Sequence, residues 1–324
     1  MVVNLIEAIN MALNFALNYD DNVVIIGEDI GKNGGVFRAT AGLQEKYPKR
    51  VLDVPLAENM IAGISVGMSA CGLRPVAEIQ FMGFLYSCLD QIISHASRMR
   101  MRTQSRLSCP MVIRAPYGCG IHAPEHHSES TEAILAHIPG IRVVIPSSPE
   151  MAYGLLLASI FNKDPVIFLE PTRIYRLFKQ DIIDDGKLLP LDTCFIVQPG
   201  KDITLVSWGA MLQETLLAAQ ELAKSNISAE VIDVATIKPL DMATILKSVA
   251  KTGICIIIHE AIKTCGVGAE IAANLADQGL TSLLAPVKRV AGLDTVIPPY
   301  RLENIYMPNV SKILQAVTEV LEYS

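Results

Sequence analysis

Three polar clusters follow short apolar runs of the sequence, and their residue types suit acid–base chemistry. Residues 27–29 contain Glu28, residues 53–58 contain Glu58, and residues 125–130 contain two adjacent histidines. Ligands of parallel α/β sheets bind beyond the carboxyl ends of the strands. These clusters are therefore where we expect a site.

Each cluster also has an ordinary structural explanation. Glu58 would stand near the N-terminus of a helix, where a carboxylate stabilises the helix dipole. His126 and His127 could be metal ligands, but side chains at neighbouring positions rarely point at one ion. Residue types and spacing alone leave these roles open.

Several common motifs are absent from the sequence. The glycine-rich segment 31–35 does not match GxGxxG, and neither a P-loop GxxxxGK[ST] nor a GxSxG elbow occurs. The seven cysteines form no CxxC pair, which argues against zinc-ribbon and thioredoxin-like sites. A site must therefore be assembled from residues scattered along the chain.

Alternating strand and helix patterns must position these clusters. In the first half, apolar runs predict strands at 23–26, 51–54, 75–81, 111–115, 141–145 and 166–169. Apolar spacing predicts helices at 5–17, 59–71 and 86–102, with others beginning near 131 and at 149. In the second half, the same patterns predict strands at 203–207, 229–233, 254–259 and 287–290, and helices at 211–225, 241–251, 267–278 and near 308–322. The fold class is therefore α/β, with mostly parallel sheets covered by helices.

Turn signals interrupt this alternation between residues 171 and 200, where proline, glycine and aspartate are frequent. We place the domain boundary there. The sequence thus predicts one domain over residues 1–185 and a smaller one over residues 190–324.

Composition excludes several classes of protein. Of the 324 residues, 51% are apolar and 19% are charged, which is the reverse of a disordered chain. The net charge of −6 argues against nucleic-acid binding. Mean hydropathy is high at +0.36, yet no apolar run reaches the ~18 residues of a membrane span. We expect the excess to cover a large subunit interface.

The cysteines and the N-terminus indicate a reducing compartment. Cys71, Cys88 and Cys255 lie in apolar segments and are expected to be reduced core residues. The first residues have the features of neither a secretory signal nor a transit peptide. We expect a cytoplasmic protein of bacterial type that does not contact membranes.

Many segments, nearly end to end and in order, carry a family resemblance. The chain resembles the beta subunit of the thiamine-diphosphate-dependent decarboxylase component of 2-oxo acid dehydrogenase complexes, whose main members act on pyruvate and on branched-chain 2-oxo acids. The matching segments are GEDIGKNGGVFRATAGL (27–43), DVPLAE (53–58), GMSACGLRPVAEIQF (67–81), DQI (90–92), IRAPYG (113–118), HHSES (126–130), IPGIRVVIPSSP (138–149), DPVIFLE (164–170), AEVIDV (229–234), PLD (239–241) and HEA (259–261).

The resemblance implies an oxidoreductase subunit with a transketolase-like pyrimidine-binding domain and a transketolase C-terminal-like domain. Such a subunit pairs with an alpha subunit in an α2β2 heterotetramer and shares thiamine diphosphate with it. The alpha subunit holds the diphosphate and magnesium through a GDG motif, which this sequence lacks. The acyl group of the 2-oxo acid, with pyruvate the expected substrate, passes to lipoyl-lysine of the dihydrolipoyl acyltransferase core, which the C-terminal domain is expected to dock.

The resemblance also implies roles for individual residues. Glu58 matches the glutamate that hydrogen-bonds the pyrimidine N1′, where a carboxyl group away from bulk water is suited to proton exchange. Leu56, Gln80 and Phe84 match residues that line the pyrimidine pocket, with Phe84 stacking on the ring. Glu28 would assist as part of an acidic relay. His127 matches the histidine that faces the substrate and the lipoyl group, with His126 a weaker candidate.

A cation site is implied by some relatives only. In them, backbone carbonyls hold potassium, as suits a hard cation. The corresponding residues here are Met111, Ser159, Ile160, Asn162 and Asp164.

The sequence departs from the family pattern at two places. Val54 stands where the family usually has threonine, which leaves the acidic position intact. Residues 123–125, before the histidine pair, lie in a loop that varies among members and bears on substrate choice. A branched-chain 2-oxo acid or acetoin dehydrogenase beta subunit is therefore an alternative. A further alternative, an inactive assembly scaffold, is disfavoured because Glu58, Phe84 and His127 are retained.

Overall fold

The computed structural model describes residues 1–323, which form two compact units. The first unit contains residues 1–117 and 137–191. The second contains residues 118–136 together with residue 192 onward. The segment that carries the adjacent histidines therefore belongs to the second unit.

The first unit is built on a parallel sheet with strand order β6-β7-β5-β4-β2-β3. The strands of that sheet are β2 (Val23–Gly27), β3 (Val51–Asp53), β4 (Arg74–Glu78), β5 (Val112–Tyr117), β6 (Arg142–Val144) and β7 (Val166–Pro171). Strands β1 (Val2–Val3) and β8 (Gln180–Asp181) pair with each other in a separate two-stranded sheet. The α-helices are α1 (Leu5–Tyr19), α2 (Leu43–Lys46), α3 (Glu58–Ala70), α4 (Met99–Arg102) and α6 (Pro149–Ile160). Short helical turns are η1 (Met82–Cys88), η2 (Gln91–His95), η3 (Ala96–Arg98) and η5 (Thr172–Ile174).

Local signals explain where the main helices of this unit begin. Asn4 and Glu7 form a capping box at the start of α1, satisfying two backbone N–H groups. Ser148 caps α6, and Pro149 occupies its first turn. Strand β2 is buried along its whole length, as expected for a parallel strand covered on both faces.

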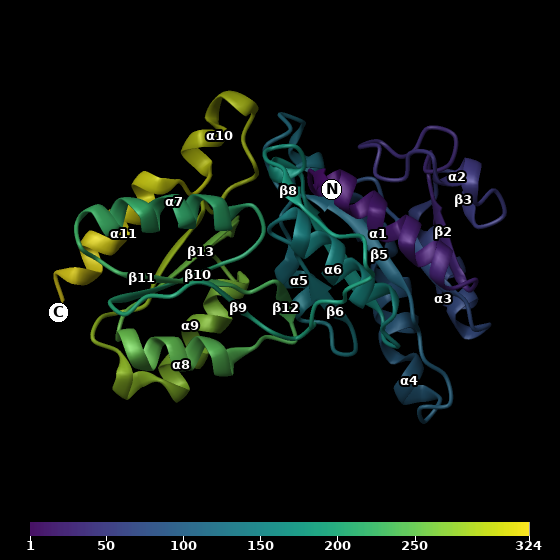
Figure 1. Ribbon diagram of the computed structural model, residues 1–324. Helices are drawn as coiled ribbons and strands as arrows, with labels where there is room; N and C mark the ends of the chain where they lie inside the picture. The colour runs from purple at the N-terminus through teal and green to yellow at the C-terminus, as the bar shows by residue number, and fades with distance from the viewer. Residues whose placement is uncertain (324) are drawn as a thin grey trace. The chain divides into compact units, whose positions relative to one another are not determined.

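The second unit contains a five-stranded sheet with strand order β14-β13-β10-β11-β9. The strands of that sheet are β9 (Phe195–Gln198), β10 (Ile203–Ser207), β11 (Ala229–Asp233), β13 (Cys255–Ile262) and β14 (Lys288–Gly292), and the unit also contains strand β12 (Thr236–Lys238) outside it. The helices are α5 (Glu132–Ala136), α7 (Met211–Lys224), α8 (Met242–Thr252), α9 (Val267–Gln278), α10 (Tyr300–Tyr306) and α11 (Val310–Leu321), with short turns η4 (Glu125–His127) and η6 (Leu280–Ser282). Within this unit, α7 and α11 cover one face of the sheet and α8 and α9 the other (Figure 1). Edge strand β9 runs antiparallel to β11, and the other pairs in this sheet are parallel.

The α/β fold class with two helix-covered, mostly parallel sheets is confirmed, but two local expectations were wrong. The helix expected over 86–102 is broken into η1, η2, η3 and α4. Ser97 and Thr103 each donate a side-chain hydrogen bond to a carbonyl four residues earlier, which loosens a helix. The sequence patterns also missed β9 and α10. Cys71 is exposed rather than buried, because it follows the last residue of α3.

Among residues 1–323, no helix combines the length and the apolar character needed to cross a bilayer. The same residues contain no cluster of three or more His, Cys, Asp or Glu side chains able to hold a metal ion.

Candidate active site

Two carboxylates meet where β2 ends and α3 begins. Glu28 follows β2 directly, and Glu58 is the first residue of α3. The Val54 N–H donates to the Gly27 carbonyl at 3.0 Å, so the two chain segments run side by side. Burial raises the pKa of Glu28, and the charges of Glu58 and Asp29 raise it further. The two sequence-predicted carboxylates are therefore close enough for the charge of Glu58 to act on Glu28.

Glu28 is nearly inaccessible, with 5% of its surface exposed. Neither of its oxygens makes a hydrogen bond of normal geometry within residues 1–323, although the backbone N–H of Ala57 lies close enough to oppose the rise in pKa. A buried carboxylate without a partner is costly. This arrangement suits a site that receives a hydrogen-bonding group from outside the chain.

The first turn of α3 is fixed against η1. Ala57 provides no side-chain cap, so Glu58 is the acidic group nearest the positive end of the helix. Asn59 donates its side-chain amide to the Ser87 carbonyl at 3.1 Å, and Gln91 donates to Asn59 Oδ1 at 3.1 Å. These bonds hold Glu58 on the same side of the unit as η1, which carries Phe84.

The three residues predicted to line a ring pocket all keep some exposure to solvent. Phe84 is half-buried and meets Phe81 edge-to-face, with ring centroids 5.6 Å apart. Gln80 is half-buried, whereas Leu56 is 78% exposed. A half-buried phenyl ring can stack on a ligand, and an exposed leucine suits contact with a ligand or another chain.

The glycine-rich loop beside these carboxylates is ordered by Asp53. Its carboxylate accepts the backbone N–H of Gly31 at 2.6 Å and that of Lys32 at 3.2 Å. A side chain at position 31 would meet the ends of the Asp53 and Gln44 side chains and would have to displace them. The Thr40 hydroxyl donates to the Ile30 carbonyl at 2.6 Å and closes the loop on its other side.

A buried charged cluster in the first unit was missed by the sequence reasoning. Arg114 on β5 donates to Glu78 at 2.8 Å and to Glu170 at 2.7 Å. The Tyr175 hydroxyl donates to the other Glu170 oxygen at 2.6 Å. Burial raises the pKa of Glu78, with Arg114 opposing the rise and Glu170 adding to it. The available signal was a charged residue within or at the end of three otherwise apolar strands.

The adjacent histidines lie on η4 in the second unit. His126 is exposed, and its Nδ1 is 4.0 Å from Glu129. His127 is half-buried, with its Nδ1 shielded from solvent. The Gly118 N–H donates to the Glu129 carbonyl at 2.9 Å, so residues 119–130 form a closed loop, named here the histidine loop.

Two of the carbonyl groups expected to hold potassium bind an arginine instead. Arg74 donates to the carbonyls of Ile160 and Asn162 at 3.1 and 3.0 Å. The Met111 and Ser159 carbonyls accept backbone N–H groups at 3.0 and 3.2 Å. A potassium ion would share its ligands with a guanidinium that already supplies positive charge, so this set fits the ion poorly and stays a prediction.

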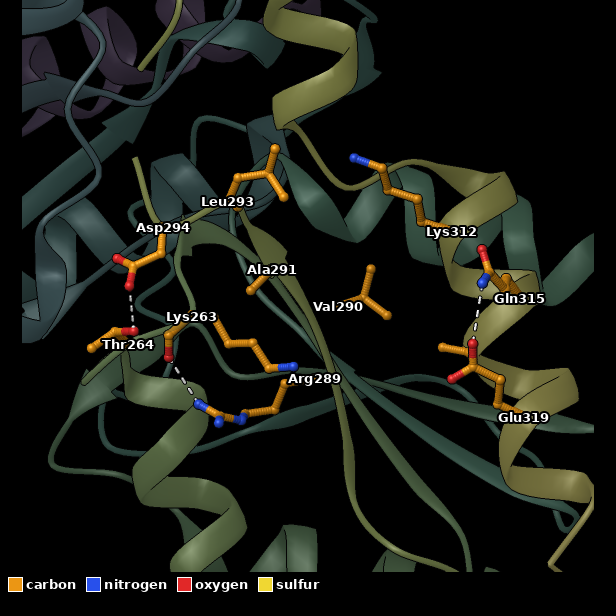
Figure 2. Close-up of a pocket in the computed structure, with 12 residues that line it drawn as sticks. Lys263, Thr264, Arg289, Val290, Ala291, Leu293, Asp294, Lys312, Gln315 and Glu319 are labelled. Carbon is orange, nitrogen blue, oxygen red and sulfur yellow. Dashed lines mark hydrogen bonds between the residues drawn. The ribbon is translucent and has the colours of Figure 1, made fainter. Parts of the chain in front are cut away.

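The second unit also contains an open pocket of about 480 Å³ beside β14 and α11. Figure 2 shows Lys263 and Arg289 on one side and Lys312, Gln315 and Glu319 on the other. Its carboxylates have partners, since Asp294 accepts from Thr264 at 2.8 Å and Glu319 binds Lys288 at 2.9 Å. None of the sequence-predicted site residues lines this pocket.

Comparison with known families matches both halves of the chain. Residues 2–177 match the family model "Transketolase, pyrimidine binding domain", and residues 192–313 match "Transketolase, C-terminal domain". A solved structure described as "Split gene transketolase, inactive beta4 tetramer" aligns with a TM-score of 0.82 at 21% identity, covering 99% of each chain. At 21% identity this structural similarity shows a shared fold and nothing about function.

Three relatives that match nearly the whole chain have the same name. The chain is 45% identical to "Pyruvate dehydrogenase E1 component subunit beta" of Bacillus subtilis (strain 168), and the match covers 99% of each chain. It is 44% identical to the protein of the same name from Staphylococcus epidermidis (strain ATCC 12228), with the same coverage. The protein so named from Staphylococcus aureus (strain N315) is 42% identical, again over 99% of each chain.

Proposed function

The chain belongs to the family of pyruvate dehydrogenase E1 component beta subunits, and on that premise we propose that it acts with an alpha subunit to decarboxylate pyruvate using thiamine diphosphate. The acetyl group would pass to lipoyl-lysine of a dihydrolipoyl acyltransferase. The main support is identity of 42–45% to relatives of that name over nearly the whole chain. Buried Glu28 beside half-buried Glu58 supports the proposal, because a carboxyl pair of this kind suits the proton exchange of the first step.

The cofactor, when bound, supplies the electron sink for decarboxylation. In this proposal the carboxyl group of Glu58 shares a proton with the N1′ nitrogen of the aminopyrimidine. Glu28 supports that exchange because its burial and its charge coupling to Glu58 keep a proton available to the pair. The unpartnered oxygens of Glu28 favour this role over a purely structural one.

Three neighbouring side chains would bind and orient the pyrimidine. Phe84 would stack on the ring, and Gln80 and Leu56 would line the pocket. The exposure of Leu56 favours a pocket that the alpha subunit completes. We propose that the alpha subunit holds the diphosphate and magnesium, in keeping with the absence of a GDG motif from this chain.

His127 would face the substrate and the incoming lipoyl group. Its half-buried ring in a closed loop suits a donor held at a fixed orientation. Hydrogen bonds to a developing oxyanion contribute about 3 kcal/mol to catalysis. We further propose that the second unit docks the acyltransferase core and that the assembled enzyme is an α2β2 heterotetramer.

The test is to purify the alpha–beta complex and compare kcat/KM for pyruvate, 2-oxoisovalerate and acetoin. We expect pyruvate to be preferred and its acyl group to appear on lipoyl domains. Preference for 2-oxoisovalerate or acetoin would move the chain to a sister enzyme with the same chemistry. A correctly assembled complex that turns over none of them would support the scaffold alternative.

A further inference from the structure

One buried carboxylate joins the two ends of the histidine loop. Glu260 lies on β13 and is 2% exposed. Its Oε1 accepts the backbone N–H of Cys119 at 3.3 Å and also accepts the Ser130 hydroxyl. Cys119 is the first residue of the loop and Ser130 the last, so a single oxygen closes the neck of the loop.

Gly118 lets the chain pass close to that carboxylate. Its φ is +86°, a left-handed conformation that favours glycine, and a side chain there would collide with Glu260. The neck is therefore built around Glu260 by backbone conformation as well as by hydrogen bonds.

A second carboxylate binds the loop nearer its middle. Glu303 on α10 accepts the Gly120 N–H at 3.2 Å, and its other oxygen lies 3.9 Å from His122 Nε2. The His122 ring also packs on Tyr300, with ring centroids 3.6 Å apart. The loop is thus bound to two separate elements of the second unit.

The strand that carries Glu260 is itself fixed by aromatic packing. The neighbouring His259 is fully buried and stacks on Trp208, with ring centroids 5.1 Å apart and planes inclined by 8°. Trp208 Nε1 donates to Glu132 at 3.1 Å, two residues beyond the end of the loop. Glu260 therefore has little freedom to move, and its hydrogen bonds transmit that rigidity to the loop.

We propose that Glu260 is a positioning residue that closes the neck of the histidine loop and so holds His127 in its working orientation. The inference deepens the proposed function, since it rests on His127 facing the substrate and the lipoyl group. Glu260 acts through the loop and has no contact with reacting atoms in this proposal. A loop of this kind needs such anchors, because ordering an irregular backbone costs conformational entropy and the few hydrogen bonds within the loop do not offset that free-energy cost.

The test compares Glu260→Ala, Glu260→Gln and Ser130→Ala in the alpha–beta complex. Two quantities are measured: hydrogen exchange of the amides in residues 119–130, and the rate of pyruvate-dependent acylation of a lipoyl domain. Loss of the anchor in Glu260→Ala should raise loop exchange and lower kcat about tenfold or more, because misplacement of a catalytic group is costly. Thiamine diphosphate affinity should change less than about twofold, since the pyrimidine contacts of the proposed function lie in other residues.

Glu260→Gln keeps an acceptor oxygen of the same reach and should recover most of both readouts. Ser130→Ala removes only a hydroxyl and should give an intermediate effect, which keeps the test usable if Glu260→Ala does not fold. Glu230→Gln is the matched control. Glu230 is a buried strand carboxylate of the same unit that accepts the Gly200 N–H at 3.3 Å and binds Lys251, away from the loop.

Unchanged loop exchange in both Glu260→Ala and Ser130→Ala would overturn the inference. Equal losses of cofactor affinity and acylation, without rescue by Glu260→Gln, would overturn it too, by making Glu260 a general stability residue. Hydrogen exchange needs no turnover, so the anchoring can be judged even if the wild-type complex fails to process pyruvate. Failure of the wild-type complex would count against the proposed function instead.

Discussion

Glu58 differs from an ordinary glutamate at a helix start because the buried carboxylate of Glu28 lies beside it. A glutamate at the start of a helix ordinarily faces water and stabilises the helix dipole. Here a second carboxylate, buried and without a hydrogen-bond partner in residues 1–323, lies near enough for the charge of Glu58 to raise its pKa. Helix capping alone needs no such neighbour, whereas proton exchange with a bound ring nitrogen uses one.

The Glu58→Gln variant separates these two roles. Glutamine keeps the size and can still hydrogen-bond, but it cannot exchange a proton with N1′. The variant complex should assemble and bind thiamine diphosphate, yet lose about 10²–10⁴-fold in hydrogen–deuterium exchange at C2 of the cofactor, the usual range of general acid–base contributions. The measurement is proton NMR of the quenched complex.

Glu45→Gln is the control for that experiment. Glu45 is an exposed glutamate in the first turn of α2, so its loss removes a helix-terminal charge without touching the carboxylate pair. Exchange at C2 should be unaffected. Near-normal exchange in Glu58→Gln as well would mean that Glu58 is only a helix cap.

Site residues that follow a local sequence pattern were predicted, whereas those whose partners lie far away in the sequence were missed. Glu28 and Glu58 stand directly after strand-like runs, so their approach to one sheet edge could be inferred from a parallel fold. Glu78, Arg114 and Glu170 sit within or at the end of apolar strands, where a charge is unexpected. Their pairing depends on the adjacency of β4, β5 and β7, which no local pattern reveals. Glu260 was missed for the same reason, since its partners lie 130 and 141 residues away.

At the scale of elements, buried strands were the most predictable features. Their β-branched runs cover β2, β10 and β13 closely, because these central strands are buried on both faces. Edge strand β9 contains Ile196 and Val197, but both are exposed and the strand lies within the turn-rich segment 171–200, so it was not predicted. The breaks in the helical segment 82–102 were not predicted, because apolar spacing carries no information about side-chain hydrogen bonds to the helix backbone.

The packing of α5 within the second unit creates a pH-sensitive contact. Glu132 is fully buried, and burial together with the charge of Glu260 raises its pKa from 4.5 to about 8. The unfolded chain therefore releases this proton at lower pH than the folded protein does. The free energy of unfolding should fall as pH rises from about 4.5 to about 8, by at most ~1.4 kcal/mol per pH unit from this group.

Glu132→Gln should remove that dependence. Glutamine has no proton to lose and can still accept from Trp208, so the variant should gain stability over wild type as pH rises through this window. Urea unfolding followed by the fluorescence of Trp208, the only tryptophan in the chain, measures the difference. Glu230→Gln should show no such gain between pH 4.5 and 8, because hydrogen bonds from Lys251 and Ser248 outweigh burial and lower the pKa of Glu230, which places its titration below this window. Parallel stability profiles for wild type and Glu132→Gln would contradict the assignment.

At the scale of the whole molecule, apolar side chains remain exposed in both units. Leu56, Val296 and Leu284 are 78%, 71% and 64% exposed. The sequence indicated this surplus through its positive hydropathy, but composition could not say where it lies. Single exposed apolar residues are common on protein surfaces, and only a contiguous patch marks an interaction site. An alpha subunit that completes the site, as proposed above, would cover some of this surface.

The isolated chain should therefore be inactive and self-associating. It carries the carboxylate pair and the aromatic side chain of the proposed pyrimidine pocket, but it lacks a GDG motif for the diphosphate and magnesium. Alone it should bind thiamine diphosphate weakly, decarboxylate no 2-oxo acid, and form concentration-dependent oligomers because its apolar contacts are open. Sedimentation velocity and a decarboxylation assay, each with and without the alpha subunit, measure both properties. Addition of the alpha subunit should replace the self-associated species with one discrete complex and bring activity with it. Robust decarboxylation by the isolated chain would show that the whole site lies within one polypeptide, and the shared-site proposal would have to be abandoned.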